Sequence, residues 1–184
     1  MVCPVCGGAC GYRDIDPYYR EVRELWPARF GFVPVARFQC RGTEGKYPTF
    51  SMLPYQLVPY HRYTVASMVA ALILWREYWR EPGEPGTAYR VEQELPASSG
   101  VSSWQLHCWL VAFQLWLRRS QWELDGRYDF AGVPYGASVL GEVYGYFEAL
   151  SRGPPGRGEA VVSCVHEHGI RTGRFLLGVP SQGR

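Results

Sequence analysis

The clearest periodic pattern in the chain lies between residues 102 and 122. Apolar side chains recur there at intervals of three and four positions: Leu106, Trp109, Leu110, Phe113, Trp116 and Leu117. This spacing gathers them on one face of a helix, which a folded protein buries. A hydroxyl at Ser102 or Ser103 can accept a hydrogen bond from the unpaired N–H groups of the first turn. We therefore predict a helix from these serines to about Trp122, with its apolar face in the core.

Similar signals predict three further helices. The apolar run VASMVAALILW follows Thr64, which predicts a helix from Thr64 to about Trp79 with the threonine as N-cap. The EPGEPG segment ends this helix, because proline and glycine oppose helical continuation. Thr87 is expected to cap a short helix over residues 87–94, and PASSG to form the next turn. The last predicted helix covers residues 137–150 and buries Leu140, Val143, Tyr144 and Phe147.

The two ends of the chain carry less regular patterns. Within residues 13–30, helical spacing predicts a short amphipathic helix through Tyr19, Val22, Leu25 and Trp26. Residues 32–39 alternate between apolar and polar, which predicts a strand that ends at Cys40. Three closely spaced prolines make residues 48–63 an extended connector. The RGPPGRGE segment over residues 152–159 predicts a linker before a last apolar piece.

Composition places the chain among folded proteins. Hydrophobic residues make up 47% of its 184 positions, which suits one ordinary domain or two small modules with a shared core. The net charge is only +2, so nucleic-acid contact is permitted but not required. Residues 1–63 hold eight Arg or Lys against five Asp or Glu, so the basic surplus lies at the N-terminal end.

The sequence favours a cytoplasmic protein. The longest apolar run has about half of the ~20 residues that a membrane span needs. Met1 leads directly into CPVC, with no apolar segment of the kind that a signal peptide contains. In a reducing compartment the six cysteines are expected to be thiols or metal ligands, and not disulfides.

Cysteine spacing at the N-terminus predicts a metal site. Cys3 and Cys6 form a C-x-x-C turn, which supplies two ligands for a tetrahedral Zn²⁺ ion, and Cys40 is the natural third ligand. A zinc ribbon would have a second C-x-x-C there, but Thr43 stands where its last cysteine would be. Cys10 and the more distant His61 are the candidates for a fourth ligand.

The alternative is a ribbon without metal. Its cysteines would be reduced, and it would be held together by aromatic side chains: Trp26, Phe30, Phe38 and Phe50.

The helices of residues 64–124 have the order of a helix-turn-helix. In that motif a short helix and a turn precede a longer helix, whose N-terminal residues enter the major groove of DNA. The residues expected to face base edges are Ser102, Ser103, Gln105 and His107. Arg118 and Arg119 would lie near phosphates. A plain helical bundle with a solvated polar face explains the same pattern.

Two other groups of residues are candidates for metal-dependent catalysis. On a strand, Cys164, His166 and His168 of SCVHEHG would point to one side, which suits a metal-dependent enzyme. Asp125, Asp129 and Glu142 are the carboxylates available for metal-dependent phosphoryl transfer, but no buried strand is predicted to present them.

The order of these motifs resembles a known family. CPVCGG, then RFQC after a strand, then TFSMLP and LVPYHRY before a helix are similar to the N-terminal region of bacterial insertion-sequence transposases. More closely, they resemble short transposase-associated proteins, and the FLLGVPSQGR tail looks like their ending. The resemblance implies DNA binding in mobile-element biology, with zinc held by Cys3, Cys6 and Cys40. Thr43 departs from the pattern, and the transposase catalytic triad has no match.

These inferences combine into one expected organisation. We predict a mainly α protein with a small β-containing zinc ribbon in residues 1–63, a helix-turn-helix-like domain in 64–124, and a C-terminal helix and tail in 125–184. It would bind DNA without cleaving it, as an accessory factor or as the remnant of a longer transposase, with a further copy or a transposase as possible protein partner. The alternatives are a protein-interaction module that docks through its tryptophans and the metal-dependent enzyme above.

Overall fold

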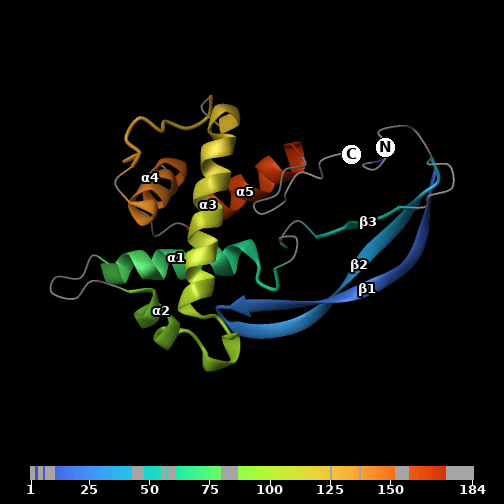
Figure 1. Ribbon diagram of the computed structural model, residues 1–184, viewed down its shortest axis with the longest axis horizontal. Coiled ribbons are helices and arrows are strands. Elements are labelled where there is room, and N and C mark those ends of the chain that lie inside the picture. Colours follow the sequence, from blue (N-terminus) through green and yellow to red (C-terminus); the bar gives the residue numbers. More distant parts are fainter. Residues whose placement is uncertain are drawn as a thin grey trace.

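The computed structural model consists of a long β-hairpin that extends from a helical body (Figure 1). It describes residues 3, 6, 11–42, 48–54, 57, 61–79, 87–124, 126–136, 138–151 and 158–172. The strands are β1 (Tyr12–Leu25), β2 (Ala28–Cys40) and β3 (Thr49–Met52). The helices are α1 (Val65–Trp79), α2 (Ala88–Glu94), the 3-10 turn η1 (Ala97–Ser99), α3 (Ser103–Leu124), α4 (Val139–Ser151) and α5 (Gly158–Thr172).

β1 and β2 pair antiparallel over nearly their whole length, and β3 adds to the other edge of β2. Tyr12 pairs with Cys40 at the open end of the hairpin, and Leu25 pairs with Ala28 beside the turn. The strand predicted over residues 32–39 is confirmed. The helix predicted within residues 13–30 is wrong, because pairing with β2 satisfies the backbone of β1 and Pro17 opposes a helix there.

The turn end of the hairpin is attached to α1. Leu25 is buried, and its N–H donates to the Ser67 hydroxyl oxygen at 3.0 Å. Arg23 joins β1 to two other segments. Its backbone N–H donates to the Arg62 carbonyl before α1, and its guanidinium donates to the Ser99 carbonyl of η1 at 2.9 Å. These bonds orient the hairpin relative to the helices.

The helices predicted over residues 64–79, 87–94 and 102–122 are confirmed together with their caps. The Thr64 side chain accepts from the Ser67 N–H at 3.2 Å, Thr87 accepts from Arg90, and Ser102 accepts from Gln105 at 3.2 Å. The predicted core face of α3 is buried in full. α4 begins two residues later than predicted; it buries Val143, Tyr144 and Phe147, while Leu140 is partly buried.

α5 was missed by the sequence analysis. The predicted linker reaches Glu159, but the helix already includes Gly158 and Glu159. The condition under which Cys164, His166 and His168 would share a side, a strand, is not met, because these residues belong to α5. The buried residues of α5 explain this, since they recur at three- and four-residue intervals: Val161, Cys164, Val165 and His168.

One cluster of buried apolar side chains connects the three predicted segments. It includes Leu25 of the hairpin, Leu106 of α3 and Phe147 of α4. α1 packs on α2, α3 and α5, so it lies at the centre of the body. Among the described helices, none combines the length and apolar composition that a bilayer crossing requires.

Close packing at Gly145 gives a test of the fold. A Cβ at this position of α4 would lie 2.5 Å from Pro134 Cδ and 3.2 Å from the Val133 Cα. We expect Gly145→Ala to lower the free energy of unfolding by about 1–3 kcal/mol, although alanine favours helices. Urea denaturation measures this. Gly132→Ala is the control, because nothing lies within 4 Å of its added carbon. Equal free energies of unfolding for the two variants would contradict the close packing of Gly145 against Pro134 and Val133.

Candidate functional site

Three cysteines come together at the open end of the hairpin. The sulfur atoms of Cys3, Cys6 and Cys40 all lie within 4.8 Å of one another. Cys3 and Cys40 are buried, with 1% and 0% of their surface exposed, while Cys6 is exposed. Together these residues could hold a metal ion.

The strand ends fix the position of Cys40. Its N–H donates to the Pro48 carbonyl beside β3, and the next N–H, of Arg41, donates to the Gly11 carbonyl before β1. The Gly42 N–H donates to the Cys40 sulfur at 3.4 Å, a contact that stabilises a thiolate. Residues next to β1 and β3 thus help to fix the position of Cys40 at the end of β2.

An aromatic cluster supports the same end of the sheet. Phe38 stacks on Phe50 at 5.4 Å between ring centroids, and Tyr12 meets both rings edge-on. The sequence analysis named Phe38 and Phe50 as the apolar support of the ribbon, and they lie on adjacent strands. Trp26 and Phe30 belong to the other end, beside the hairpin turn.

The donor set fits a soft divalent ion. Thiolates are the typical ligands of structural Zn²⁺, and burial of two charged sulfurs would be costly without a cation between them. His61, a predicted alternative fourth ligand, does not belong to the described cluster. Its backbone carbonyl accepts a hydrogen bond from Arg20. Cys10 and Thr43 lie outside the described residues.

The residues predicted to read DNA bases lie at the N-cap and in the first two turns of α3, but several have local contacts. Ser102 is the N-cap, and the Ser103 N–H donates to the Glu92 carboxylate at 2.6 Å. His107 meets the Trp75 ring edge-on at 4.9 Å. Gln105 is half-buried on the flank of the helix.

The two predicted phosphate-contacting residues differ in environment. Arg118 donates to both oxygens of Glu142 on α4, at 2.5 and 2.6 Å, whereas Arg119 is exposed. Gln114 donates to the same carboxylate at 2.9 Å. Glu142 is 1% exposed, and its pKa is lowered by the bond from Arg118 and, to a smaller extent, by Gln114. Arg118 thus joins α3 to α4.

The structure separates the predicted enzyme residues. Because α5 is a helix, Cys164 and His168 share a face, while His166, two positions from each, lies on another. His168 Nε2 lies 2.7 Å from the Glu123 carboxylate, and burial raises the pKa of the Cys164 thiol, which disfavours the reactive thiolate. These three residues do not form a metal-binding group within the described part of the chain.

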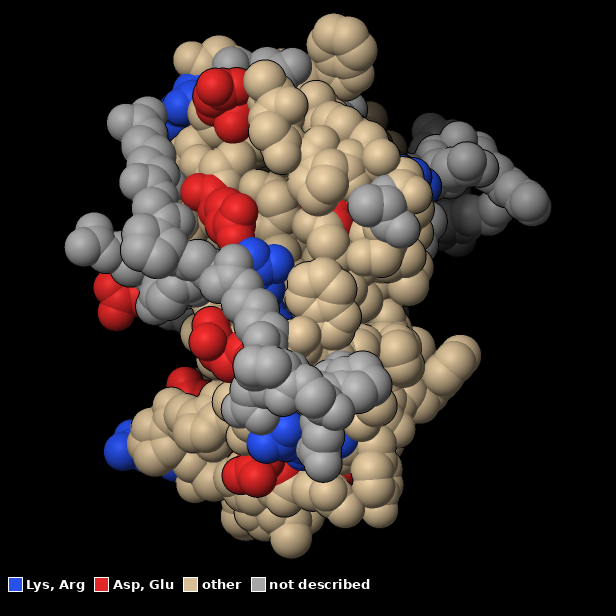
Figure 2. All heavy atoms as spheres, turned by 90° about the vertical axis from the view of Figure 1, so that its left-hand side faces the viewer, with Lys and Arg blue, Asp and Glu red and all other residues tan. Residues whose placement is uncertain are grey.

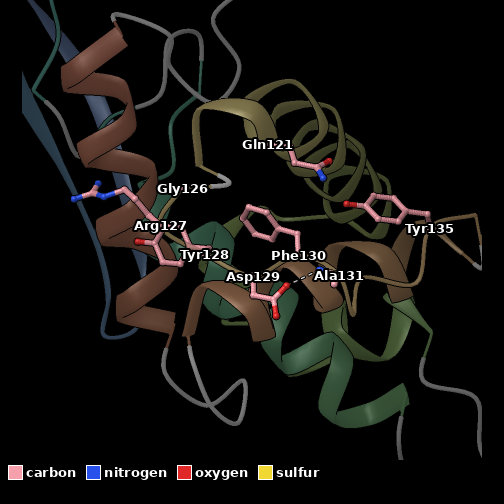
Figure 3. Close-up of a pocket in the computed structure, with 8 residues that line it drawn as sticks. All are labelled: Gln121, Gly126, Arg127, Tyr128, Asp129, Phe130, Ala131 and Tyr135. Atoms are coloured by element: carbon pink, nitrogen blue, oxygen red, sulfur yellow. Dashed lines mark hydrogen bonds between the residues drawn. The ribbon is translucent and has the colours of Figure 1, made fainter.

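A pocket of about 570 Å³ lies between the loop after α3 and the C-terminal part of that helix (Figure 3). Asp129, one of the predicted carboxylates, accepts from the Ala131 N–H at 2.9 Å, so it stabilises the loop. Gln121 and Tyr135 both bond to the hydroxyl of Tyr146. Glu142 is held by Arg118 instead, and Asp125 lies outside the described residues. Among the described carboxylates no metal-binding group is found.

Comparison with known proteins adds no relative. Protein-family models, curated proteins and solved structures were all searched, and none matches the chain. The resemblance to transposase-associated proteins therefore stays a prediction.

A basic surface near the cysteines was missed by sequence reasoning. Arg13 pairs with Gln39, and Arg37 pairs with Ile15, so both arginines belong to one face of the sheet. Arg41 is exposed directly after Cys40 of the cysteine cluster. By contrast, acidic and basic side chains are interspersed on the face of the helical body seen in Figure 2. The predicted strand over residues 32–39 contains Arg37, but Arg13 lies in the segment interpreted as helical, so the pairing that places both on one face was not predicted.

Metal content provides a direct test of the cysteine cluster. Purified protein should contain about one equivalent of Zn²⁺, and Cys40→Ser should reduce it to well below half, because a buried ligand is lost. Elemental analysis measures both. Cys108→Ser is the control and should retain the metal. Metal retained in full by Cys40→Ser would refute the cluster as a metal site, while loss in Cys10→Ser or His61→Ala would identify the fourth ligand.

The pair between Arg118 and Glu142 predicts a pH-dependent stability. A lowered pKa means that the unfolded chain binds the proton more readily, so this contribution is present above the ordinary pKa of glutamate and is lost as pH falls through the folded value. At neutral pH, Glu142→Gln should lower the free energy of unfolding by about 1–2 kcal/mol. The difference from wild type should shrink below about pH 4. Urea titrations at several pH values measure it, and a constant difference would contradict the assignment.

Proposed function

We propose that this protein binds DNA through the metal-stabilised open end of its β-hairpin. In this proposal the hairpin end is a zinc ribbon with fewer cysteines than a complete one, and Cys3, Cys6 and Cys40 hold the ion. The observation that carries the proposal is the proximity of this cluster to the basic face of the sheet. A bound ion would hold the strand ends, and with them the nearby arginines, in a fixed arrangement.

Charge on this face suits a phosphate backbone. Arg13 is exposed, and its Nε donates to the side chain of Gln39, its partner on β2, which holds the guanidinium on this face of the sheet. Arg37 is half-buried beside it, and Asp14 pairs with Phe38 on the opposite face. Contacts to phosphates position a protein on DNA and supply most of its non-specific affinity.

The helices contribute a second, weaker argument. α1, α2 and α3 pack on one another, an arrangement compatible with the helix-turn-helix that the sequence predicts. Ser102 and His107 are exposed at the start of α3, and Arg119 is exposed further along it. Their role would be auxiliary to that of the hairpin, since Ser103 and Arg118 already bond within the protein.

The proposed role is binding and not strand cleavage. It agrees with the resemblance to transposase-associated proteins, whose short forms lack the catalytic carboxylates of full-length transposases. We infer a cytoplasmic setting, where thiolates remain reduced and DNA is accessible.

A protein-interaction role is the second candidate. It is favoured by one observation: the outward face of α3 carries exposed apolar side chains, among them Trp104 and Trp122, with 75% and 87% of their surface exposed. Such a face is suited to another protein more than to a duplex.

A salt titration tests the DNA proposal. Fluorescence anisotropy with a labelled duplex should show affinity that falls as salt rises. The double variant Arg13→Gln/Arg37→Gln should bind about tenfold more weakly, and the slope of log K against log salt should fall by about 0.9 for each lost phosphate contact.

The control removes equal charge elsewhere. Arg127→Gln/Arg171→Gln changes two exposed arginines of the helical body and should bind nearly as wild type. An equal loss of affinity in both double variants would show that DNA affinity depends only on net charge, which would contradict the assignment of phosphate contacts to Arg13 and Arg37. Absence of salt-dependent binding by the wild-type protein would refute the proposal.

A further inference from the structure

The outward face of α3 carries a row of apolar side chains. Val111 and Leu115 are 44% and 46% exposed, and Trp104 and Trp122 extend the row toward the two ends of the helix. α3 runs in front of α1 in Figure 1, and no other labelled element covers its outward side in that view. We call these four residues the α3 stripe.

The stripe is symmetric about the middle of α3. Val111 and Leu115 stand two positions on either side of Phe113, and Trp104 and Trp122 stand nine positions on either side. At 3.6 residues per turn, both separations lead to the side of the helix opposite Phe113, within about 20°. Phe113 itself is fully buried, so all four stripe residues are directed away from the core.

This symmetry makes the stripe complementary to itself. If a second α3 lies antiparallel, with a two-fold axis level with Phe113, Trp104 meets Trp122 of the second copy and Val111 meets Leu115 of the second copy. A two-fold interface requires that one patch match its own reversed image. Equal spacing on both sides of one residue lets the row match a reversed copy of itself position by position.

Electrostatics permits the contact. The one carboxylate of α3, Glu123, is engaged by His168 of α5 and does not enter the stripe. Arg118 and Arg119 flank the stripe on its two sides. The charge of Arg118 is compensated by Glu142, and Arg119 is exposed about 60° around the helix from the centre of the stripe, at the edge of the contact. Two copies can therefore meet without bringing carboxylates, or the charge of Arg118 alone, into the contact. Tryptophan, which supplies two of the four stripe residues, is among the residues enriched in protein interfaces.

We propose that the protein forms a two-fold dimer through the α3 stripe, with the two α3 helices antiparallel. The proposal does not depend on DNA binding, because the arginines of the hairpin end lie on other elements. A dimer would carry two hairpins, and so two sets of the residues assigned above to phosphate contact.

Sedimentation velocity across the micromolar range tests the dimer. The wild-type protein should sediment as a concentration-dependent dimer. Leu115→Glu should raise the dimer dissociation constant by about 100-fold or more, because pairing would bury a carboxylate in the apolar centre of the contact. Ile170→Glu is the matched control: it changes an exposed apolar residue of α5, 70% exposed, and should leave the dimer intact. Circular dichroism and urea midpoints verify that both variants fold.

Site-directed cross-linking tests the orientation. In a Cys108→Ser background loaded with Zn²⁺, chains with Trp104→Cys are mixed with chains with Trp122→Cys and oxidised. Antiparallel pairing predicts cross-links between the two kinds of chain and few within either kind, since like positions would lie about 27 Å apart along the helix. The Cys108→Ser protein alone gives the background from other thiols.

Three results would overturn the proposal. A wild-type monomer throughout the range excludes the dimer, and a dimer that survives Leu115→Glu uses another surface. Cross-links mainly between identical chains indicate a parallel arrangement. Loss of DNA binding with the dimer intact would contradict the proposed function alone, so the two proposals fail separately.

Discussion

The junction between the hairpin and α1 is the contact on which the arrangement of this protein depends. Thr64 begins α1 by accepting from the Ser67 N–H, and the Ser67 hydroxyl oxygen in turn accepts from the N–H of buried Leu25. One short segment therefore both starts a helix and holds a strand. An isolated two-stranded hairpin is only marginally stable in water, so β1 and β2 need this attachment. It also sets the direction in which the hairpin leaves the body.

The two ends of the hairpin are stabilised by different physical means. At the turn, apolar burial of Leu25 and hydrogen bonds from Arg23 join it to the helices. At the open end three sulfurs gather within 4.8 Å, supported by stacked Phe38 and Phe50. A metal ion there would replace the large core that such a narrow sheet cannot build. The stability of that end would then follow metal supply and thiol redox state, while the body would be independent of both.

The arginines assigned to phosphate contact and the α3 stripe belong to different elements of the structure. The hairpin end has arginines on one face, whereas the outward face of α3 has tryptophans and aliphatic side chains. Phosphate contact requires accessible cations, and self-association requires dry apolar area. Because these surfaces belong to different elements, the protein can use one without covering the other. Arg118 of α3 is bound by Glu142, so its charge is compensated within the body.

The sequence by itself determined the elements whose signals are local. Thr64, Thr87 and Ser102 marked the helix starts, and the three- and four-residue spacing in α3 identified its buried face, because helical bonds and caps join residues close in sequence. It also paired Cys3 and Cys6. Tertiary structure alone decided that residues 12–25 form a strand, since their hydrogen bonds go to β2, and that Cys164 belongs to a helix packed on the body. The sequence also named Cys40 as the third member of the cysteine group, and the pairing of strands far apart in the chain brings its sulfur to the other two.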